Sequence, residues 1–225
     1  MGIKETYNRI RQEIPEHVDI VIAAKQRTAA EVEEIIDAGA VHIGENYIQE
    51  AEAMYNALGE KAKKVSWHMI GELQKNKINK ALKIFDIIQT VDSLEKAVDI
   101  DKRVANAEKQ EVKVYIEINI GAEPAKSGIM PDEKLIEELA RNIAKLDHLR
   151  LEGLMTMGPV VSNQEELRPY FRKTKKIFDK IKSLNIDNVD MKTLSMGMSD
   201  SYKIAIEEGS NMVRLGTIMF GPRRY

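Results

Sequence analysis

The chain has 225 residues, of which 43% are hydrophobic, so it is long enough to bury a substantial core in one domain. Lysine and arginine (34) nearly balance aspartate and glutamate (36), and the net charge of −2 gives no general attraction for nucleic acid or an anionic membrane. There is no cysteine, which excludes disulfides and thiolate nucleophiles. No apolar run could span a bilayer, and residues 1–14 lack the apolar stretch of a signal peptide, so we expect a cytoplasmic protein without membrane contact.

Short runs rich in Val and Ile alternate along the chain with longer segments whose apolar residues are three and four positions apart. The runs predict buried strands, and the longer segments predict amphipathic helices. The expected strands cover residues 19–25, 40–46, 65–71, 85–92, 112–121, 149–158, 191–197 and 211–217. The expected helices cover residues 4–14, 28–39 and about 47–58, a lysine-rich segment up to Ile84, a helix capped by Ser93, one from Pro131, one centred on Phe171 and Phe178, and a short one at 202–209.

This alternation favours a parallel sheet, because two parallel neighbours need a long crossover between them. About eight such units in a row predict a closed (β/α)8 TIM barrel with an extra N-terminal helix, formed as one domain by residues 1–225. The alternative is an open doubly wound sheet, but no G-x-G-x-x-G motif follows the first strand. A barrel gathers its functional residues at the C-terminal ends of its strands.

Chemically versatile residues follow most of the expected strands, so a barrel would bring them together at one mouth. They are Lys25, Glu45, Asn46, His68, Thr90, Asp92, Asn119, Met155, Thr156, residues 195–199 and Arg214. Lys25 stands out because it ends an apolar strand. A lysine in this position most often only reaches solvent. A lysine shielded by apolar neighbours, however, loses its proton more readily, and a neutral amine attacks aldehydes.

Two loops near the C-terminus predict an anion site. Gly197 and Ser199 lie in a tight turn before a helix, where backbone N–H groups and a hydroxyl bind phosphate. The alternative is that Ser199 or Asp200 only caps that helix. Gly216 and Thr217 follow the eighth strand, and barrels commonly hold phosphate with the loops after strands seven and eight. Arg214 is either an ion-pair partner of a carboxylate or a donor to a ligand's phosphate or ring nitrogen.

The remaining candidates carry weaker signals. His68, after Trp67, is more often a packing residue than a base, and four scattered histidines without H-x-x-x-H spacing argue against a metal site. Met155 and Met157 are typical of a core lining. The lysines within residues 75–83 are typical of a solvated face rather than of a nucleic-acid surface.

An amine for an aldehyde, a phosphate cradle and a partner for a ring nitrogen together describe pyridoxal 5′-phosphate (PLP) held as a Schiff base by Lys25. A class I aldolase would also use a barrel lysine and a phosphate site. It would more usually carry the lysine later in the barrel, and it would need a proton-relay partner beside it.

The chain resembles the pyridoxal phosphate homeostasis protein family, whose members are single barrels similar to the N-terminal domain of bacterial alanine racemases. The resemblance covers almost the whole chain and rests on six sequence blocks in the family's order. The set of six is specific to the family, whereas any one block alone is not. The blocks are AAK at the first strand, AGAVHIGENYIQE, WHMIGELQKNK, EINIGAEPAKSGI, EGLMTMG and LSMGMSDSYKIAIEEGSNMVRLGTIMFGPR.

This resemblance implies a role for each candidate position. Lys25 would form the Schiff base with the cofactor aldehyde, and Arg214 would pair with the pyridine nitrogen. Ser199, Gly216 and Thr217 would hold the phosphate. The positions implied at the cofactor face, or near the ring, are Asn46, His68 and Met155.

Three positions depart from the family pattern. The family often has Ser before the lysine and Pro three residues after it, where this chain has Ala24 and Thr28. Ser201 stands where an acidic residue is common. We expect these changes to leave the Schiff base intact but to alter the hydrogen bonds around it and the hold on the helix after the phosphate loop.

A pairing between Arg214 and the ring nitrogen has a mechanistic consequence. A guanidinium does not give up its proton, so the ring nitrogen stays neutral and the ring is a poor electron sink. Racemases with this arrangement recover activity with a tyrosine from a second, β-rich domain. This chain ends eleven residues after Arg214, and we do not expect Tyr225 to replace that tyrosine.

The leading hypothesis from the sequence is a non-catalytic PLP carrier. It would buffer the free cofactor, supply apo forms of PLP-dependent enzymes, and so affect amino-acid and keto-acid balance. The rival is a PLP-dependent amino-acid racemase or lyase, and a third possibility is a barrel enzyme for a phosphorylated substrate without a cofactor. A short single barrel is expected to be a monomer.

Overall fold

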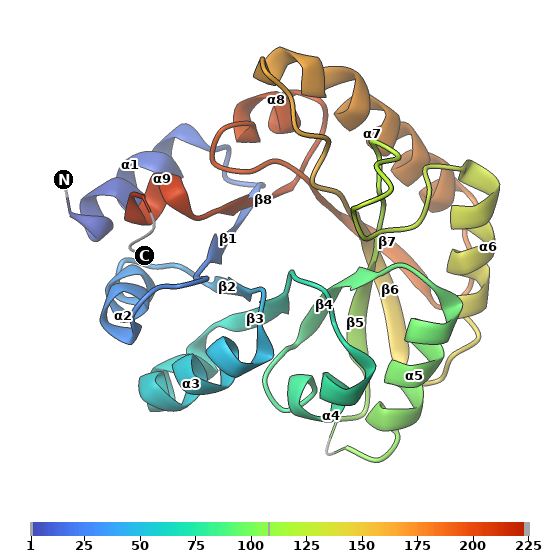
Figure 1. Cartoon of the computed structure of the whole chain (residues 1–225), viewed down its shortest axis with the longest axis horizontal. Helices are drawn as coiled ribbons and strands as arrows, with labels where there is room; N and C mark the ends of the chain where they lie inside the picture. Colours follow the sequence, from blue (N-terminus) through green and yellow to red (C-terminus); the bar gives the residue numbers. More distant parts are fainter. Residues whose placement is uncertain (1, 108, 223–225) are drawn as a thin grey trace.

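The computed structural model describes residues 2–107 and 109–222. Within them eight parallel strands close into a barrel in chain order, which confirms the predicted (β/α)8 architecture (Figure 1). The strands are β1 (Asp19–Ala23), β2 (His42–Glu45), β3 (Ser66–Met69), β4 (Ile87–Val91), β5 (Val112–Glu117), β6 (Leu149–Met155), β7 (Val189–Ser195) and β8 (Met212–Leu215).

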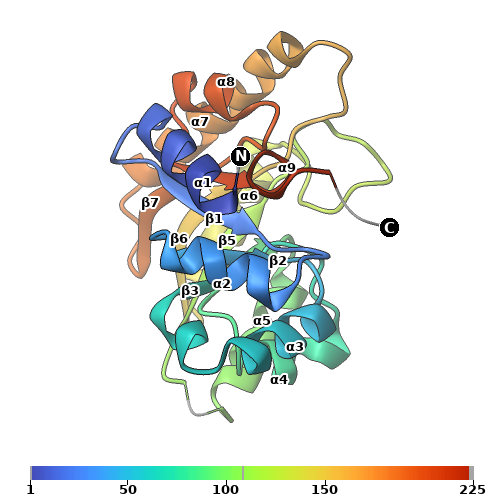
Figure 2. The ribbon, with the colours of Figure 1, turned by 90° about the vertical axis from the view of Figure 1, so that its left-hand side faces the viewer.

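Helices surround the barrel on its outside (Figure 1). They are α1 (Ile3–Glu13), α2 (Ala29–Asp37), α3 (Ile48–Leu58), α4 (Ile78–Ala81), α5 (Leu94–Val104), α6 (Glu133–Ile143), α7 (Arg168–Ser183), α8 (Tyr202–Glu207) and α9 (Thr217–Phe220). Short 3-10 turns lie at Gly59–Lys64, Lys75–Lys77 and Gln164–Leu167. The extra N-terminal helix α1 is present as expected and packs beside α9 (Figures 1 and 2).

Local sequence explains where α2 begins and ends. Thr28 Oγ1 accepts a hydrogen bond from the Glu31 backbone, and the Glu31 carboxylate accepts one from the Thr28 backbone, so both act as a capping box. Val32 and Ile35 are fully buried against the barrel. Gly39, with φ of +108°, turns the chain after the helix, a conformation that other residues rarely adopt.

Apolar side chains of β1, β4, β5, β6 and β8 divide between two separate clusters. Ile20 and Ile22 of β1 belong to the large cluster between barrel and helices, whereas Val21 belongs to a smaller one. Since successive strand residues point to opposite faces, the smaller cluster lies inside the barrel. Its members are Val21, Ile87, Tyr115, Met155 and Met212.

Besides strand ends that shift by two or three residues, the sequence patterns differ from the structure in three elements. The expected strand at 112–121 ends at Glu117, because the Asn119 side chain bonds the backbone of Glu123 in a turn. The lysine-rich helix is reduced to α4, since its asparagines are poor helix formers. The patterns predict no helix after the eighth strand, where α9 follows directly.

The loops that follow the strands project from one side of the barrel. In Figure 2 the segment between β5 and α6 extends on the right-hand side of the barrel. No helix within residues 2–107 and 109–222 is both long and apolar enough to cross a membrane.

Candidate functional site

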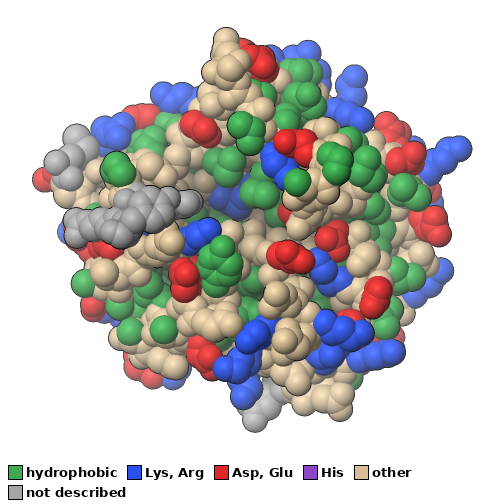
Figure 3. Space-filling view, in the orientation of Figure 1, with side chains coloured by type: hydrophobic (Ala, Val, Ile, Leu, Met, Phe, Trp, Pro, Cys, Tyr) green, Lys and Arg blue, Asp and Glu red, His purple; other side chains and the backbone are tan. Residues whose placement is uncertain are grey.

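A cavity of about 620 Å³ opens at the C-terminal ends of the strands. Figure 3 shows a hollow near the centre of this face, with positive side chains inside it and hydrophobic ones around it. The residues that line the cavity are Ala23, Lys25, Arg27, Asn46, Ile70, Met157, Met198, Ser199, Asp200, Arg214, Gly216, Thr217 and Ile218. Six of the eight positions expected from the sequence therefore meet in one place.

Lys25 lies just beyond β1, at the edge of this cavity. The strand ends at Ala23, two residues earlier than expected, and Gln26 turns the chain with φ of +59°. The Gln26 backbone N–H donates to the Glu50 carboxylate at 3.1 Å, which ties the turn to α3. The Lys25 side chain is half-buried, and its Nζ lies 3.4 Å from the hydroxyl oxygen of Tyr47. Its amine is thus held near an aromatic ring but remains within reach of a ligand.

Arg214 forms part of the cavity lining although it is only 5% exposed. Its guanidinium donates to the Ser195 carbonyl oxygen at 3.0 Å, to Ser195 Oγ at 2.7 Å and to the Thr156 carbonyl oxygen at 2.8 Å. Arginine has five N–H groups. Three of them make these hydrogen bonds, so within residues 2–107 and 109–222 two N–H groups have no protein acceptor and are left for a ligand. Burial lowers the pKa of Arg214 to about 10, and Glu117 opposes that shift, so the side chain stays charged at neutral pH.

The loops after β7 and β8 meet at the Ser199 hydroxyl. Ser199 Oγ accepts hydrogen bonds from the backbone N–H groups of Gly216 and Ile218, both at 3.2 Å. For the described part of the chain, the backbone N–H groups of Asp200 and Thr217 donate to no protein acceptor. Hydroxyl and amide donors at one end of a cavity are the chemistry that binds a phosphate.

The β7–α8 loop depends on a glycine and a buried serine. Gly197 has φ of +96°, and a Cβ there would lie 2.6 Å from Ala205 Cβ. Ser201, which is 1% exposed, accepts a hydrogen bond from the Met198 backbone at 3.1 Å. Together with the backbone hydrogen bonds from Ser201 and Tyr202 to the Met198 carbonyl oxygen, the Ser201 hydroxyl closes the loop.

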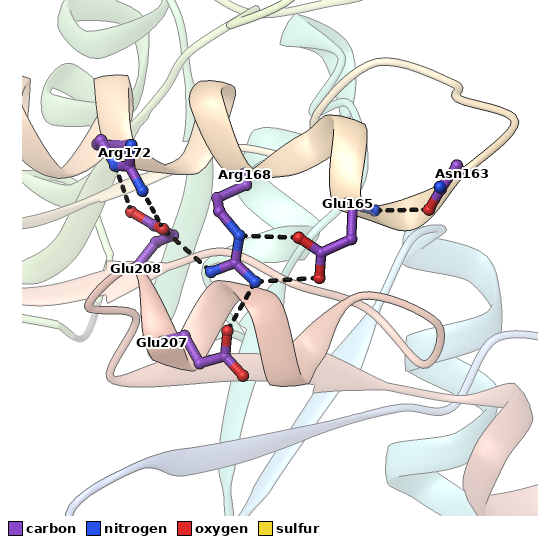
Figure 4. Close-up of polar contacts among 6 residues, drawn as sticks. All are labelled: Asn163, Glu165, Arg168, Arg172, Glu207 and Glu208. Atoms are coloured by element: carbon purple, nitrogen blue, oxygen red, sulfur yellow. Dashed lines mark hydrogen bonds and ion pairs between the residues drawn. The ribbon is translucent and has the colours of Figure 1, made fainter.

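Ion pairs fasten α8, which begins directly after this loop, to α7 (Figure 4). Arg168 contacts the carboxylates of Glu165 at 2.9 Å, Glu207 at 2.8 Å and Glu208 at 3.1 Å. Arg172 contacts Glu208 at 2.8 Å. Hydrogen bonds from Arg172 and Arg168 hold the pKa of Glu208 below its usual range. The helix that follows the β7–α8 loop is therefore anchored at its C-terminal end.

Arg27 is a cavity residue that the sequence patterns do not single out. Its Nη2 donates to the Gly221 carbonyl oxygen at 2.6 Å, and its guanidinium lies 5.1 Å from the Phe220 ring centroid. These contacts fix a second cation at the mouth, close to the α9 segment. A basic residue in the loop after the first strand is the signal that would have indicated it.

Asn46 lines the cavity as expected. It follows β2, and the chain passes so close to Gly71 that a Cβ there would lie 2.4 Å from the Asn46 carbonyl oxygen. Gly71 therefore keeps the backbone of Asn46 in place.

His68 and Met155 are not brought to the cavity surface. Both are fully buried inside the barrel, and neither is among the residues that line the cavity. β3 ends at Met69, so His68 points inward one position before the rim. Met155 packs with Val21 and Tyr115, and Met157, two residues later, reaches the cavity instead.

Two buried carboxyl groups flank the site. Burial, with the nearby Glu50, raises the pKa of Glu45 to about 8. Burial, with the nearby Asp92, raises the pKa of Glu117 to about 7. Neither group belongs to the cavity lining. Their charge at neutral pH is therefore set by the packing around the site.

Comparison with known proteins identifies the family to which the chain belongs. The alanine racemase N-terminal domain family model matches residues 2–224. The pyridoxal phosphate homeostasis protein of Aquifex aeolicus is 38% identical over 86% of this chain and 82% of its own length. That of Haemophilus influenzae is 36% identical over 100% of this chain and 98% of its own length. The chain belongs to the pyridoxal phosphate homeostasis protein family.

Solved structures agree with this family assignment. PipY of Synechococcus elongatus, solved without PLP, has a TM-score of 0.91 and is 29% identical, and the match covers 98% of this chain and 100% of PipY. PipY with PLP bound has a TM-score of 0.87 and is 28% identical, with the same coverage. The resemblance predicted from the sequence is thus confirmed, together with the barrel fold of the pyridoxal phosphate homeostasis proteins.

Proposed function

We propose that this chain binds PLP in the cavity at the barrel mouth and serves as a carrier in PLP homeostasis. Two findings about relatives support this, since the curated relatives are named for PLP homeostasis and PipY was solved with PLP bound. In this chain the proposal depends on one observation. Lys25, Arg214 and the two loops that contain Ser199 and Thr217 all line the same cavity.

The residues present fit the chemical groups of PLP. A phosphorylated pyridine aldehyde needs an amine, a donor for the ring nitrogen and an anion site. Lys25 supplies the amine, Arg214 the donor for the ring nitrogen, and the loop donors the anion site. The cavity volume of about 620 Å³ is within the range of small-ligand pockets. Gly216 also lets the segment after β8 lie close to the end of β1, because a Cβ there would lie 3.2 Å from the Ala23 carbonyl oxygen.

PLP supplies an aldehyde that forms a Schiff base with a primary amine. Lys25 would provide that amine, and Tyr47 would orient it through the contact described above. Ser199, Gly216 and Thr217 would hold the phosphate, with Asn46 beside the cofactor face. The Ser199 hydroxyl keeps both loops together before any ligand arrives, so little ordering remains to be done on binding.

Arg214 favours a carrier over an enzyme. Its remaining N–H groups would donate to the ring nitrogen, and a charged guanidinium offers that nitrogen no proton. A neutral pyridine withdraws electrons weakly, so the site would retain the cofactor without strongly promoting carbanion chemistry. Apo forms of PLP-dependent enzymes are the recipients that we propose.

One observation favours the alternative of an amino-acid racemase or lyase. The Tyr47 hydroxyl lies 3.4 Å from Lys25 Nζ, which is where a second proton-transfer group would be useful. Tyr47 is 49% exposed, so water reaches this hydroxyl freely. That exposure is typical of a rim residue rather than of an enclosed general base.

Two measurements separate carrier from enzyme. The PLP-loaded chain is mixed with an apo PLP-dependent enzyme, and transfer faster than release into a solution containing a PLP trap supports delivery. The loaded chain is also incubated with a panel of amino acids in deuterium oxide. Incorporation of α-deuterium at many turnovers per site would overturn the carrier proposal, whereas incorporation below one equivalent supports it.

A further inference from the structure

A continuous line of hydrogen bonds crosses the barrel interior beneath the cavity. Arg214 Nη1 donates to Ser195 Oγ at 2.7 Å, and Ser195 Oγ donates to Gln89 Oε1 at 2.8 Å. Gln89 Nε2 lies 2.9 Å from His68 Nδ1, and His68 Nε2 lies 3.0 Å from His42 Nδ1. The five residues come from β8, β7, β4, β3 and β2, so the line joins most of the barrel wall.

Arginine and the orientation of the Gln89 amide together set the direction of the bonds. Arginine has only donors, so Ser195 Oγ accepts from Arg214, and the Ser195 hydroxyl donates a hydrogen bond to Gln89 Oε1. The amide NH2 group of Gln89 then faces His68 Nδ1, which must be the bare ring nitrogen. His68 therefore carries its proton on Nε2 and donates it toward His42.

Burial makes each of these bonds costly to lose. Ser195, Gln89 and His68 are fully buried. A buried polar group that loses its partner destabilises the fold, because no water is present to replace the hydrogen bond. Burial lowers the pKa of His68 well below its ordinary value, and His42 and Lys113 lower it further. The far end at His42 is 19% exposed and lies 3.8 Å from the Asp19 carboxylate.

We propose that Gln89 and His68 are positioning residues that fix the Arg214 guanidinium through the Ser195 hydroxyl. This inference rests on the proposed function, because Arg214 is the residue that would meet the ring nitrogen of PLP. It assigns a role to His68 inside the barrel, where the sequence resemblance had implied a contact with the cofactor face.

The relay, which is the line of hydrogen bonds from Arg214 to His42, acts by fixing the direction of the Ser195 hydroxyl. With its oxygen toward Ser195, Gln89 accepts the hydrogen bond of the hydroxyl, and the oxygen lone pairs of Ser195 stay turned toward Arg214. A reversed amide would place its NH2 group against Ser195 Oγ, and the hydroxyl would lose its acceptor and turn away. His68 in the Nε2–H tautomer opposes that reversal, because its bare Nδ1 accepts from an NH2 group but has no proton for a carbonyl oxygen.

Two backbone carbonyl groups, of Ser195 and Thr156, also hold Arg214. If they alone fixed the guanidinium, the side chains of the relay would contribute only to stability. The test must therefore measure a property of Arg214 or of His68, and not only whether the barrel folds.

The first test needs no cofactor. Nitrogen-15 NMR of the histidine rings in the chain without PLP should show His68 as a neutral ring protonated on Nε2 from about pH 6 to 8. In Gln89→Met, which removes the amide at similar volume, the His68 Nδ1 resonance should shift because its donor is lost. A His68 ring protonated on Nδ1 would overturn the relay.

The second test measures PLP binding. Gln89→Met should weaken PLP affinity about tenfold, because the Ser195 hydroxyl is no longer fixed and its hydrogen bond with the charged Arg214 is worth about that factor. Tyr115→Phe is the matched control, because Tyr115 is also buried inside the barrel and its hydroxyl bonds Thr193, outside the relay. That variant should bind PLP as the wild-type chain does. If Gln89→Met fails to fold, Ser195→Ala replaces it with the same expected loss.

A double-mutant cycle decides whether the effect passes through Arg214. In an Arg214→Gln background, Gln89→Met should change PLP affinity less than twofold. An equal loss in both backgrounds, or wild-type affinity for Gln89→Met alone, would contradict the proposal. If the wild-type chain takes up no PLP, the proposed function fails, and the NMR result still decides the relay.

Discussion

The Nζ atom of Lys25 lies 3.4 Å from the hydroxyl oxygen of Tyr47 and 4.8 Å from the centroid of its ring. The contact combines a hydrogen bond with a cation–π interaction, and both come from one side chain at the start of α3. The amine on which the proposed function depends is thus held by an aromatic neighbour at the cavity rim.

Replacement of Tyr47 by Phe separates these two contributions. Tyr47→Phe keeps the ring and loses the hydroxyl, so we expect PLP uptake to be retained with affinity lowered less than about fivefold, since an exposed neutral hydrogen bond is weak. The measurement is an absorbance titration with PLP. A complete loss of uptake would show that the hydroxyl, and not the amine alone, forms the binding site.

The Ser199 hydroxyl ties the two phosphate-binding candidate loops together. Ser199→Ala removes the acceptor of two backbone N–H groups, so PLP affinity should fall about tenfold. Affinity for pyridoxal, which lacks the phosphate, should change little. Ser162→Ala, at an exposed serine bonded to Glu166, is the control. Equal losses for PLP and pyridoxal would argue that the loops do not hold the phosphate.

The buried carboxyl of Glu45 should make stability depend on pH. Because its pKa is raised to about 8, the folded chain binds a proton that the unfolded chain has released above about pH 4.5. The free energy of unfolding should therefore fall as pH rises from about 5 to 8. The contribution of this group is roughly 2–4 kcal/mol over that window.

Glu45→Gln isolates this contribution, because glutamine resembles the protonated acid. The variant should be more stable than the wild-type chain at pH 8 and should show a flatter profile in urea denaturation between pH 5 and 8. Part of the fall should remain, since the pKa of Glu117 is also raised. Glu60→Gln, at an exposed position, should leave the profile unchanged. A wild-type chain that gains stability from pH 5 to 8 would contradict the assignment.

The Arg168 ion pairs should protect the β7–α8 loop. Arg168→Gln removes contacts with three carboxylates, so α8 should loosen and backbone amides of residues 196–201 should exchange hydrogen faster. Hydrogen exchange read by mass spectrometry measures this directly. Arg141→Gln, which breaks a single pair within α6, is the control. Unchanged exchange in the loop would show that ion pairs to α7 do not anchor it.

Much of the barrel follows from the sequence, because each strand is a short apolar run and each long helix has an apolar stripe. Residues near the strand ends, such as Lys25, Asn46 and Thr217, could be placed at the mouth from that alternation alone. The sequence predicts a longer helix than α4, because its apolar spacing is helical whereas its asparagines, which are poor helix formers, do not change that spacing.

The rest depends on tertiary structure. Whether His68 reaches the mouth depends on the residue at which β3 ends, and a shift of one position reverses the side-chain direction. The partnership of Gln89 with Ser195 joins residues 106 positions apart, which no local pattern reports. Arg27 faces the cavity only because the turn at Gln26 directs it there.

The central claim is that Lys25 is the amine that captures PLP, and borohydride trapping tests it most directly. The PLP-loaded chain is reduced, digested and mapped by mass spectrometry, in parallel with Lys25→Ala and with Lys126→Ala as a control lysine at a neighbouring loop. We expect one adduct, on Lys25, that persists in Lys126→Ala and disappears in Lys25→Ala. An adduct on another lysine, or an unchanged PLP spectrum in Lys25→Ala, would contradict the account.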